Sequence, residues 1–369
     1  MRYLIEIAFT VLLLTALSDG QLQGSSCTMK NTGKAGVCTP FANCQSAKDA
    51  SYKGNLPQKC DLIDDDSDLV CCVAATCPPL LEGLVTQLPI GSRAADYCME
   101  LAQKIHPCQE TDSGWTRGNI CHNLTPESNI EYKRTPMATM AEAPHYGRFG
   151  QGQIGAISWA NYPVNLVSDQ WVVCSAWAIG SIQVLFVGLG GTFEPKYTPD
   201  ETYGVTERRI HPLYNGSYSV YYNDIALLRL DRRVTFTTRI LPACLHTGTP
   251  LPDSGFIQSD SAGLKTTMQR PSQEECSNLF TNTHGHPDGV LNDMEICSLP
   301  VNTTGECVGW YQGSPLTLPN SLRVACTHLL VGYKSYYIGS PCAVINTRIS
   351  KFIPWIEDIV WPVSGGVVV

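Results

Sequence analysis

Ser175 and Ser314 are two of the hydroxyl side chains from which acyl-transfer chemistry could start in this sequence. A serine oxygen attacks a carbonyl only when a base takes its proton, a carboxylate orients that base and donors stabilise the developing oxyanion. The stretch "SDQWVVCSAWAIGS", Ser168 to Ser181, contains no histidine beside Ser175. The indole of Trp177 has an N–H donor but no basic lone pair, so it cannot accept a proton at neutral pH. These residues supply a hydroxyl without a base.

Two other stretches carry residue types that could bind a metal ion. His284 and His286 in "HGHPDG" offer two imidazoles, and the run from Asp61 to Asp68, "DLIDDDSD", offers carboxylates that could form a calcium site or a docking patch. No third ligand accompanies the histidine pair, and an acidic run is most often a solvated loop. We therefore expect no metal and no other cofactor.

The composition is that of an exported protein with a sizeable core. The chain has 369 residues, of which 43% are hydrophobic and 16% charged, and its net charge of -8 disfavours binding to nucleic acid and to anionic membranes. Residues 1–20, with Arg2 before an apolar stretch that ends near Leu17, read as a secretory signal peptide. No later apolar run is long enough to span a membrane. We expect a secreted, extracellular protein without membrane insertion.

Cysteines and glycosylation motifs fit this compartment. The 17 cysteines point to disulfides, and their odd number leaves at least one thiol without an internal partner. Sequons for N-glycosylation begin at Asn123, Asn215 and Asn302, and the turn-like "YNGS" makes Asn215 the best candidate.

Residues 21–75 are expected to form a small cysteine-rich domain. Its cysteines are Cys27, Cys38, Cys44, Cys60, Cys71 and Cys72. A segment this short cannot be stabilised by burial alone, so cross-links must constrain it. The spacing closely resembles the clip domain of arthropod haemolymph proteases, and that resemblance implies the pairs Cys27–Cys71, Cys38–Cys60 and Cys44–Cys72. Zinc binding is disfavoured by the compartment and by the lack of a paired Cys-x-x-Cys spacing.

Residues 76–140 are expected to be a linker with one short helix. "SRAADYCMELAQKI", Ser92 to Ile105, has a serine cap and apolar residues at helical spacing. "YKRT" places Arg134 just before the next domain, where a trypsin-like protease could cut the chain, although the motif could equally be a charged loop.

Residues 141–369 alternate short strand-like runs with turns. The strand-like runs are "WVVCSAWAI", "SIQVLFVGL", "DIALLRL", "VACTHLLVGYKSYY" and "AVINTRIS", and only the final "SKFIPWIEDIV" looks helical. This pattern predicts an all-β double barrel or sandwich with a C-terminal helix.

Ordered motifs in this region resemble the trypsin and chymotrypsin family. They are "HPLYN" at His211, "YNDIALLRLDRRV" at Tyr222, "LPACL" at Leu241, "ECSNLF" at Glu275, "EICSLP" at Glu295, "GECVGWYQGSPL" at Gly305 and "SPCAVINTRISKFIPWI" at Ser340. The resemblance implies a mainly β protein in which a trypsin-like double β-barrel with a C-terminal helix follows the disulfide-rich clip domain. It also implies the disulfides Cys276–Cys297 and Cys307–Cys342 and a tether from Cys121 to Cys244. Cys98 could compete with Cys121 for Cys244, and Cys174 and Cys326 either pair together or include the free or intermolecular thiol. The cysteines whose pairing stays open are Cys77, Cys98, Cys108, Cys174 and Cys326.

The same resemblance implies that the catalytic triad is degenerate. It places Trp177 at the base, Asp224 at the orienting carboxylate and Tyr311 at the nucleophile, or Gln312 when counted back from Pro315. A buried carboxylate needs partners. We expect hydrogen bonds to Asp224 from the Trp177 indole, the Ser335 hydroxyl or both.

Further departures concern activation and the substrate pocket. Trp310 stands where the family has the aspartate that pairs with a newly cut N-terminus. One family disulfide is also lost at both ends, because Ala178 replaces one of its cysteines and the partner position, near Tyr162, is not a cysteine either. Gly305 replaces a basic-selecting aspartate, and Val344 and Tyr337 replace wall glycines, so the primary specificity pocket is expected to be filled.

The resemblance implies a non-catalytic serine protease homologue. Such a protein would act as a cofactor or regulator of an extracellular protease cascade in arthropod innate immunity, in melanisation or Toll-type signalling. Its partners would be other haemolymph clip-domain proteases or homologues, prophenoloxidase or opsonin-type proteins. The alternative is a residual serine-type endopeptidase that uses displaced residues such as Ser175 or Ser314.

Overall fold

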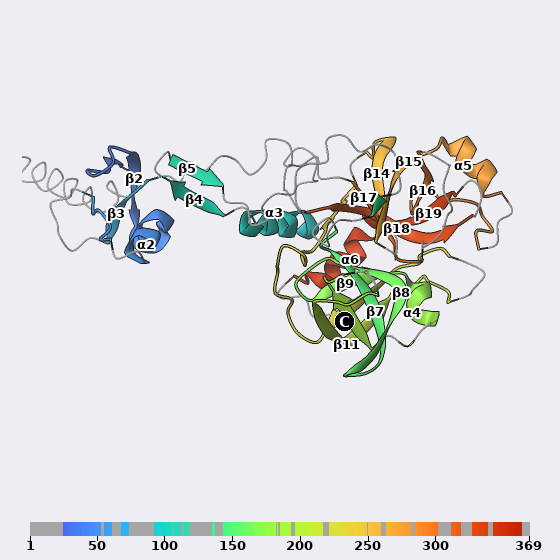
Figure 1. The fold of residues 1–369 in the computed structure, drawn as a ribbon. Helices are drawn as coiled ribbons and strands as arrows, with labels where there is room; N and C mark the ends of the chain where they lie inside the picture. Colours follow the sequence, from blue (N-terminus) through green and yellow to red (C-terminus); the bar gives the residue numbers. More distant parts are fainter. Residues whose placement is uncertain are drawn as a thin grey trace, which may run out of the picture. The chain divides into compact units, whose positions relative to one another are not determined.

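The computed structural model describes residues 25–52, 55–60, 68–73, 92–105, 107–111, 114–117, 135–136, 143–181, 183, 185–192, 196–216, 221–248, 250–259, 263–281, 285–301, 311–318, 327–338 and 342–363. The chain divides into a small unit, Met1–Pro78 with Cys108–Arg117, and a large unit, Pro79–Pro107 with Gly118–Val369. The expected linker therefore contributes residues to both units. Figure 1 labels many of the helices and strands of each unit.

The small unit contains a three-stranded antiparallel sheet in the order β1–β2–β3. Its elements are β1 (Ser26–Thr28), β2 (Ala35–Pro40), η1 (Phe41–Asn43), α2 (Gln45–Tyr52) and β3 (Leu69–Cys72), with a separate hairpin of β4 (Cys108–Thr111) and β5 (Gly114–Arg117). The structure forms the disulfides Cys27–Cys71, Cys38–Cys60 and Cys44–Cys72, which are the pairs that the resemblance implied. In the described part of the chain, the one group of three candidate metal ligands consists of cysteines from these disulfides, so their sulfurs are not free to bind an ion.

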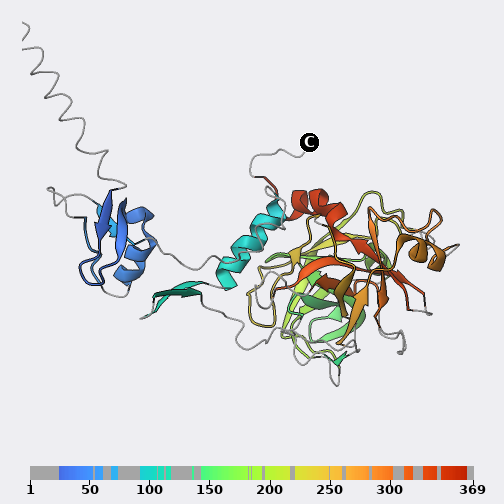
Figure 2. The same ribbon diagram turned by 90° about the horizontal axis from the view of Figure 1, so that it is seen from above.

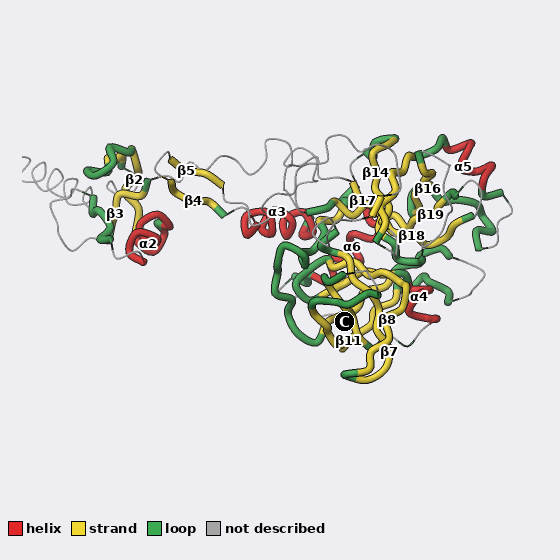
Figure 3. The backbone as a smooth tube through the Cα atoms, viewed as in Figure 1, coloured by secondary structure: helices red, strands yellow, loops and turns green. Residues whose placement is uncertain are grey.

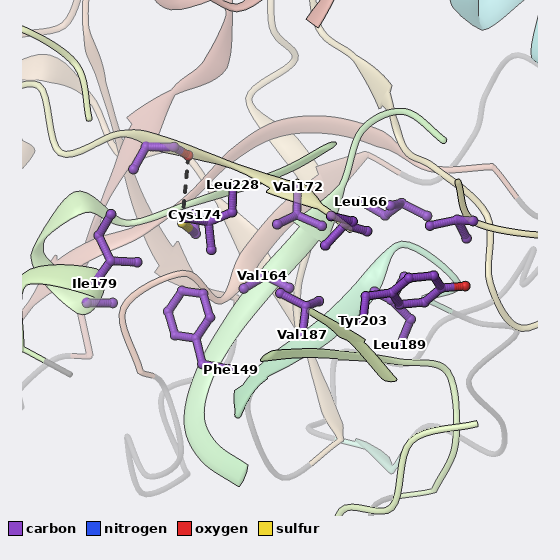
Figure 4. Close-up of a cluster of buried hydrophobic side chains, with 14 of the residues drawn as sticks. Phe149, Val164, Leu166, Val172, Cys174, Ile179, Val187, Leu189, Tyr203 and Leu228 are labelled. Atoms are coloured by element: carbon purple, nitrogen blue, oxygen red, sulfur yellow. Dashed lines mark hydrogen bonds between the residues drawn. The ribbon is translucent and has the colours of Figure 1, made fainter. Parts of the chain in front are cut away.

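One of the two large sheets of the large unit is a closed six-stranded barrel. Its strands are β7 (Tyr146–Gln153), β8 (Ala156–Leu166), β9 (Trp171–Cys174), β10 (Phe186–Leu189), β11 (Glu201–Ile210) and β12 (Ala226–Leu230). Side chains such as Phe149, Val187 and Leu228 fill its interior (Figure 4). Cys174 lies in the same core as a free thiol, with its Sγ 3.7 Å from the Ala226 carbonyl oxygen, so it does not pair with Cys326.

A second ring of strands follows. It contains β14 (Ser254–Ser259), β15 (Leu264–Gln269), β16 (Glu295–Pro300), β17 (Pro315–Leu318), β18 (Leu329–Tyr337) and β19 (Val344–Arg348), and the pairing of β18 with β19 closes it. β13 (Cys244–Leu245) adds to β18 in parallel, and β6 (Thr135–Pro136) adds to β15. The trypsin-like double β-barrel predicted from the sequence is confirmed, and Figure 3 shows both sets of strands in yellow.

Apolar side chains of both barrels meet in a shared core. Val173 and Leu227 come from the first barrel, Leu330 and Tyr333 come from the second, and the C-terminal segment of η3 (Ile349–Phe352) and α6 (Ile353–Val360) packs against them. The predicted C-terminal helix is therefore confirmed. The expectation of no other helix in this region was wrong, because α4 (Ala176–Ser181) follows β9 directly and Ser272 caps α5 (Gln273–Leu279) through the main-chain N–H of Glu275.

The predicted linker helix is present as α3 (Arg93–Ile105) and belongs to the large unit. Its N-terminus lies beside α6 (Figure 2). There Glu357 accepts a hydrogen bond from the main-chain N–H of Ala94 at 2.9 Å. The apolar face of α3 packs against the rest of the large unit and brings Cys98 to Cys244. The Cα atoms of these two cysteines are 5.3 Å apart, and the cysteines form a disulfide. The expected tether from Cys121 to Cys244 is therefore wrong, because the amphipathic helix delivers a different cysteine to the same strand.

The remaining disulfides of the large unit include Cys276–Cys297, as implied. Cys342 is also disulfide-bonded, and its expected partner Cys307 lies outside the described residues. No helix in the described ranges is long and apolar enough to cross a membrane.

Candidate functional site

Asp224 is a fully buried residue between the two barrels, just before β12. Its main-chain oxygen accepts hydrogen bonds from the Tyr333 hydroxyl at 2.8 Å and from the Thr347 hydroxyl at 3.1 Å. Asn223, with a φ of 57°, turns the chain immediately before it. β18 and β19 of the second barrel thus fix the backbone that carries a carboxylate of the first barrel.

The Asp224 carboxylate accepts several hydrogen bonds from nearby residues. The Ser175 hydroxyl lies 2.9 Å from each carboxylate oxygen, and the Ser335 hydroxyl donates to Oδ2 at 2.7 Å. The main-chain N–H of Trp177 donates to Oδ1 at 2.8 Å. The predicted bond from Ser335 is confirmed. Trp177 contributes its main chain instead of its indole, because α4 begins at Ala176 and the free N–H groups of its first turn face the carboxylate.

Burial and hydrogen bonding act on Asp224 in opposite directions. Loss of hydration raises the pKa of the Asp224 carboxyl from 3.8 to about 6, and the hydrogen bonds from Trp177, Ser335 and Ser175 limit that rise. Ser175 also accepts the main-chain N–H of Ala178 at 3.2 Å and so caps α4. Its hydroxyl is fully buried and is engaged as donor and acceptor in structural hydrogen bonds.

Aromatic rings occupy the surroundings of Trp177. The ring of Tyr162 lies edge-on to Trp177 with 5.9 Å between centroids, and Tyr311 lies edge-on to Tyr162 at 5.7 Å. Such edge-to-face pairs are favourable arrangements of aromatic quadrupoles. The three side chains connect the expected base position to the expected nucleophile position through a row of aromatic contacts.

The turn after Tyr311 is fixed by its glycine. Gly313 has a φ of 96°, and a Cβ there would lie 2.2 Å from the Pro163 carbonyl oxygen, so only glycine fits. Its N–H donates to the Lys334 carbonyl at 2.8 Å. Ser314 follows as a fully buried residue whose Oγ has no hydrogen-bond partner in the described part of the chain. The structure therefore brings Ser314 to β18, but no described base lies within hydrogen-bond reach of its Oγ.

Lys334 is an unexpected buried residue on β18. It is 1% exposed, its Nζ lies 4.0 Å from the centre of the Tyr337 ring, and burial lowers the pKa of its ammonium from 10.5 to about 7. Val344, on the neighbouring strand, is fully buried. Val344 and Tyr337 were the two residues expected to fill the primary pocket; Val344 is buried, whereas Tyr337 is 40% exposed and its ring lies against the Lys334 ammonium.

Histidines of the described ranges form no hydrogen bond to the Asp224 carboxylate. His286 lies 2.9 Å from Glu295, and both side chains are buried, so this member of the histidine pair has a structural partner. The rings of His145 and His328 lie 5.2 Å apart, and burial lowers the pKa of His145. His211 packs edge-on against aromatic side chains of the C-terminal segment.

Several residues singled out in the sequence lie outside the described residues. They are Asp61 to Ser67, Cys77, Cys121, Asn123, Arg134, His284, Asn302, Gly305, Cys307, Trp310 and Cys326, together with the signal peptide. Asn215 is described and exposed. Thr135, which follows Arg134, pairs with Lys265 as part of β6.

Sequence reasoning missed the roles of Ser175 and Lys334 at this site. Ser175 lies between the end of β9 and the start of α4, which is the position of an N-cap residue. Serine is a preferred N-cap residue, and this preference was the signal that the sequence offered. Lys334 interrupts the strand-like run "LLVGYKSYY". A charged residue within such a run indicates either that the strand lies at the edge of a sheet or that the charge is buried.

Comparisons with known proteins agree with this architecture. Residues 165–356, more than half of the chain, match the family model described as Trypsin. The chain is 25% identical to "Serine protease snk" of Drosophila melanogaster over 94% of this chain and 80% of that protein. It is 27% identical to "Melanization protease 1" of Drosophila melanogaster over 43% of this chain and 44% of that protein. It is 28% identical to "CLIP domain-containing serine protease B10" of Anopheles gambiae over 43% of this chain and 45% of that protein.

The matches to the last two relatives therefore span less than half of each protein, whereas the match to the first spans most of it. From the double barrel, the site around Asp224, the family match and these relatives, it follows that the chain belongs to the trypsin family, as a member of the arthropod clip-domain serine proteases.

Proposed function

We propose that the protein is a secreted, non-catalytic serine protease homologue that acts as a cofactor or regulator of an extracellular protease cascade in arthropod innate immunity. The observation that carries this proposal is the set of groups that hydrogen-bond to the Asp224 carboxylate. Its hydrogen bonds come from the hydroxyls of Ser175 and Ser335 and from the main chain of Trp177. None of these groups can accept a proton from a nucleophile at neutral pH.

The geometry disfavours residual hydrolase activity. The Ser175 hydroxyl is fully buried and donates a hydrogen bond to Asp224, and Ser314 is fully buried with no described group within hydrogen-bond reach of its Oγ. A nucleophile must reach a substrate carbonyl, and a general base must lie within hydrogen-bond reach of it. A displaced serine mechanism would require both conditions to be created by rearrangement of packed strands.

Names of relatives support the cascade role. "Melanization protease 1" and "Phenoloxidase-activating factor 1" of Holotrichia diomphalia are among the similar proteins. In this proposal the barrel surface serves as a docking scaffold for a protease, for prophenoloxidase or for an opsonin-type protein, and the clip domain provides a second contact. Cleavage at Arg134 would regulate this docking without assembling a catalytic site.

The cascade role is tested in immune-challenged haemolymph depleted of this protein. Adding back the intact protein is expected to restore phenoloxidase activation to the level before depletion, and affinity capture is expected to recover cascade components. An Arg134→Ala variant, run beside it, is expected to differ in captured partners or in restoration. If depletion and add-back leave activation unchanged, the cofactor proposal is wrong; if the variant matches the intact protein in both assays, the cleavage switch is wrong.

A further inference from the structure

A groove beside Trp177 is not used by the site around Asp224. It has a volume of about 260 Å³ and is lined by Ala176, Trp177, Gly180, Ile210, Tyr214, Asn215 and Gly216. One wall comes from α4 and the other from the end of β11 with the turn that follows it. The groove therefore borders the first barrel's half of the candidate site.

The walls of this groove suit a ring with both apolar and polar faces. Trp177 and Tyr214 supply aromatic surface and Ile210, 47% exposed, supplies an aliphatic rim. Gly180, another lining residue, leaves open space, since a Cβ there would meet no atom within 4 Å. Aromatic faces with polar edges bind amphipathic rings well, and a pyranose ring presents C–H groups on its faces and hydroxyl groups around its rim.

Asn215 places a sugar attachment point on the groove itself. It begins the sequon Asn-Gly-Ser, it is exposed, and it is one of the lining residues. Gly216, with a φ of 66° and no atom near a would-be Cβ, leaves open space beside the asparagine. A group attached to Asn215 would be held beside the groove at high effective concentration, so even weak contacts could keep it there.

We infer that Asn215 carries an N-linked glycan whose first sugar packs into this groove against Trp177 and Tyr214 and covers the Trp177 side of the site. In the attachment step the Asn215 side-chain nitrogen loses a proton and bonds to C1 of N-acetylglucosamine, while the bond from C1 to the oxygen of a polyprenyl pyrophosphate donor breaks. The packed sugar removes the aromatic surface from water, and this apolar burial favours the folded-back position. The inference does not depend on the proposed cascade role.

Hydroxyl-radical footprinting with peptide mass spectrometry tests the inference on the full-length secreted protein. We expect a glycan mass on the Asn215 peptide and several-fold slower oxidation of Trp177 and Tyr214 than in an Asn215→Gln variant. Enzymatic removal of the glycan from the wild-type protein is expected to give the faster rates as well. Ile154, 88% exposed at the tip of the β7–β8 hairpin, serves as an internal reference whose rate stays constant.

Variants at Ser217 separate the glycan from the asparagine side chain. Ser217→Ala removes the sequon and leaves Asn215 in place, so its Trp177 and Tyr214 rates are expected to match those of Asn215→Gln. Ser217→Thr keeps the sequon and is expected to match the wild type. An Asn215 peptide without a glycan, or a glycosylated protein whose Trp177 and Tyr214 are oxidised as fast as in the variants, would overturn the inference.

Discussion

The Ser335 hydroxyl on β18 donates a 2.7 Å hydrogen bond to Oδ2 of Asp224, which belongs to the loop before β12. This contact joins a side chain of the second barrel to a buried carboxylate of the first. Ser175 binds the same carboxylate from the start of α4. The carboxylate therefore holds the two barrels and a helix terminus together, and its effects on stability can be measured.

The pH dependence of unfolding should report the buried Asp224 directly. Its folded-state pKa is raised from 3.8 to about 6, so the folded protein binds more protons than the unfolded chain between these values. The stabilisation that this group contributes is fully present below pH 3.8 and is lost as the pH rises through about 6. The total loss is about 3 kcal/mol. We expect Asp224→Asn to remove this part of the fall between pH 4 and 6, measured by denaturant unfolding. Equal slopes for wild type and variant would contradict the assignment.

Removing either hydroxyl that binds Asp224 should destabilise the protein. Ser335→Ala deletes one hydrogen bond to a buried charge, at a cost of about 1.5–3 kcal/mol. Ser175→Ala is expected to cost more, because it also removes the cap of α4. Ser158→Ala, on the exposed part of β8, is the matched control and should change the free energy of unfolding by less than ~0.5 kcal/mol. Costs for the two buried serines no larger than the control would show that these bonds contribute little.

Lys334 should make the protein less stable as a cation than as a neutral amine. Its folded-state pKa is lowered to about 7 from 10.5, so the unfolded chain binds more protons between these values and stability rises with pH across this range. Lys334→Met removes the buried ammonium but also its contact with Tyr337. We expect the net effect at pH 7 to be a free energy of unfolding that is higher by on the order of 2 kcal/mol. Lys351→Met, which removes an exposed pair with Asp293, should have little effect. A destabilised Lys334→Met protein would show that the ammonium has a stabilising role in this core.

The disulfide of α3 should be found between Cys98 and Cys244 by peptide mapping under non-reducing conditions. Cys98→Ser is expected to release α3 and expose the segment around it to proteolysis, with a loss of stability of roughly 2–5 kcal/mol. Cys121→Ser should leave α3 protected. A map that links Cys121 to Cys244 would contradict the structure at this point.

Much of the fold and part of the site could be predicted from the sequence. Ordered motifs around Asp224 and the cysteine spacing resembled known families, and that resemblance implied the double barrel and the clip-domain disulfides that the structure forms. Six cysteines alone permit fifteen pairings, so their spacing could not determine the connectivity. The bond from Ser335 was predicted because a buried carboxylate needs donors. The main-chain bond from Trp177 was missed because it depends on where α4 begins. Cys98 and Lys334 could not be placed with certainty from the sequence, since the docking of a helix face and the burial of a long side chain are set by tertiary packing.

We propose that the protein has neither a catalytic base beside Asp224 nor a serine that a substrate can reach, and labelling by a fluorophosphonate reagent is the sharpest test of this proposal. Intact-mass spectrometry of the purified protein, with an active trypsin-like protease as positive control, is expected to show the adduct on the control and none on this protein. Peptide substrates are expected to remain uncleaved in the same preparation. An adduct that disappears in Ser175→Ala or Ser314→Ala, together with peptide hydrolysis lost in the same variant, would contradict the account.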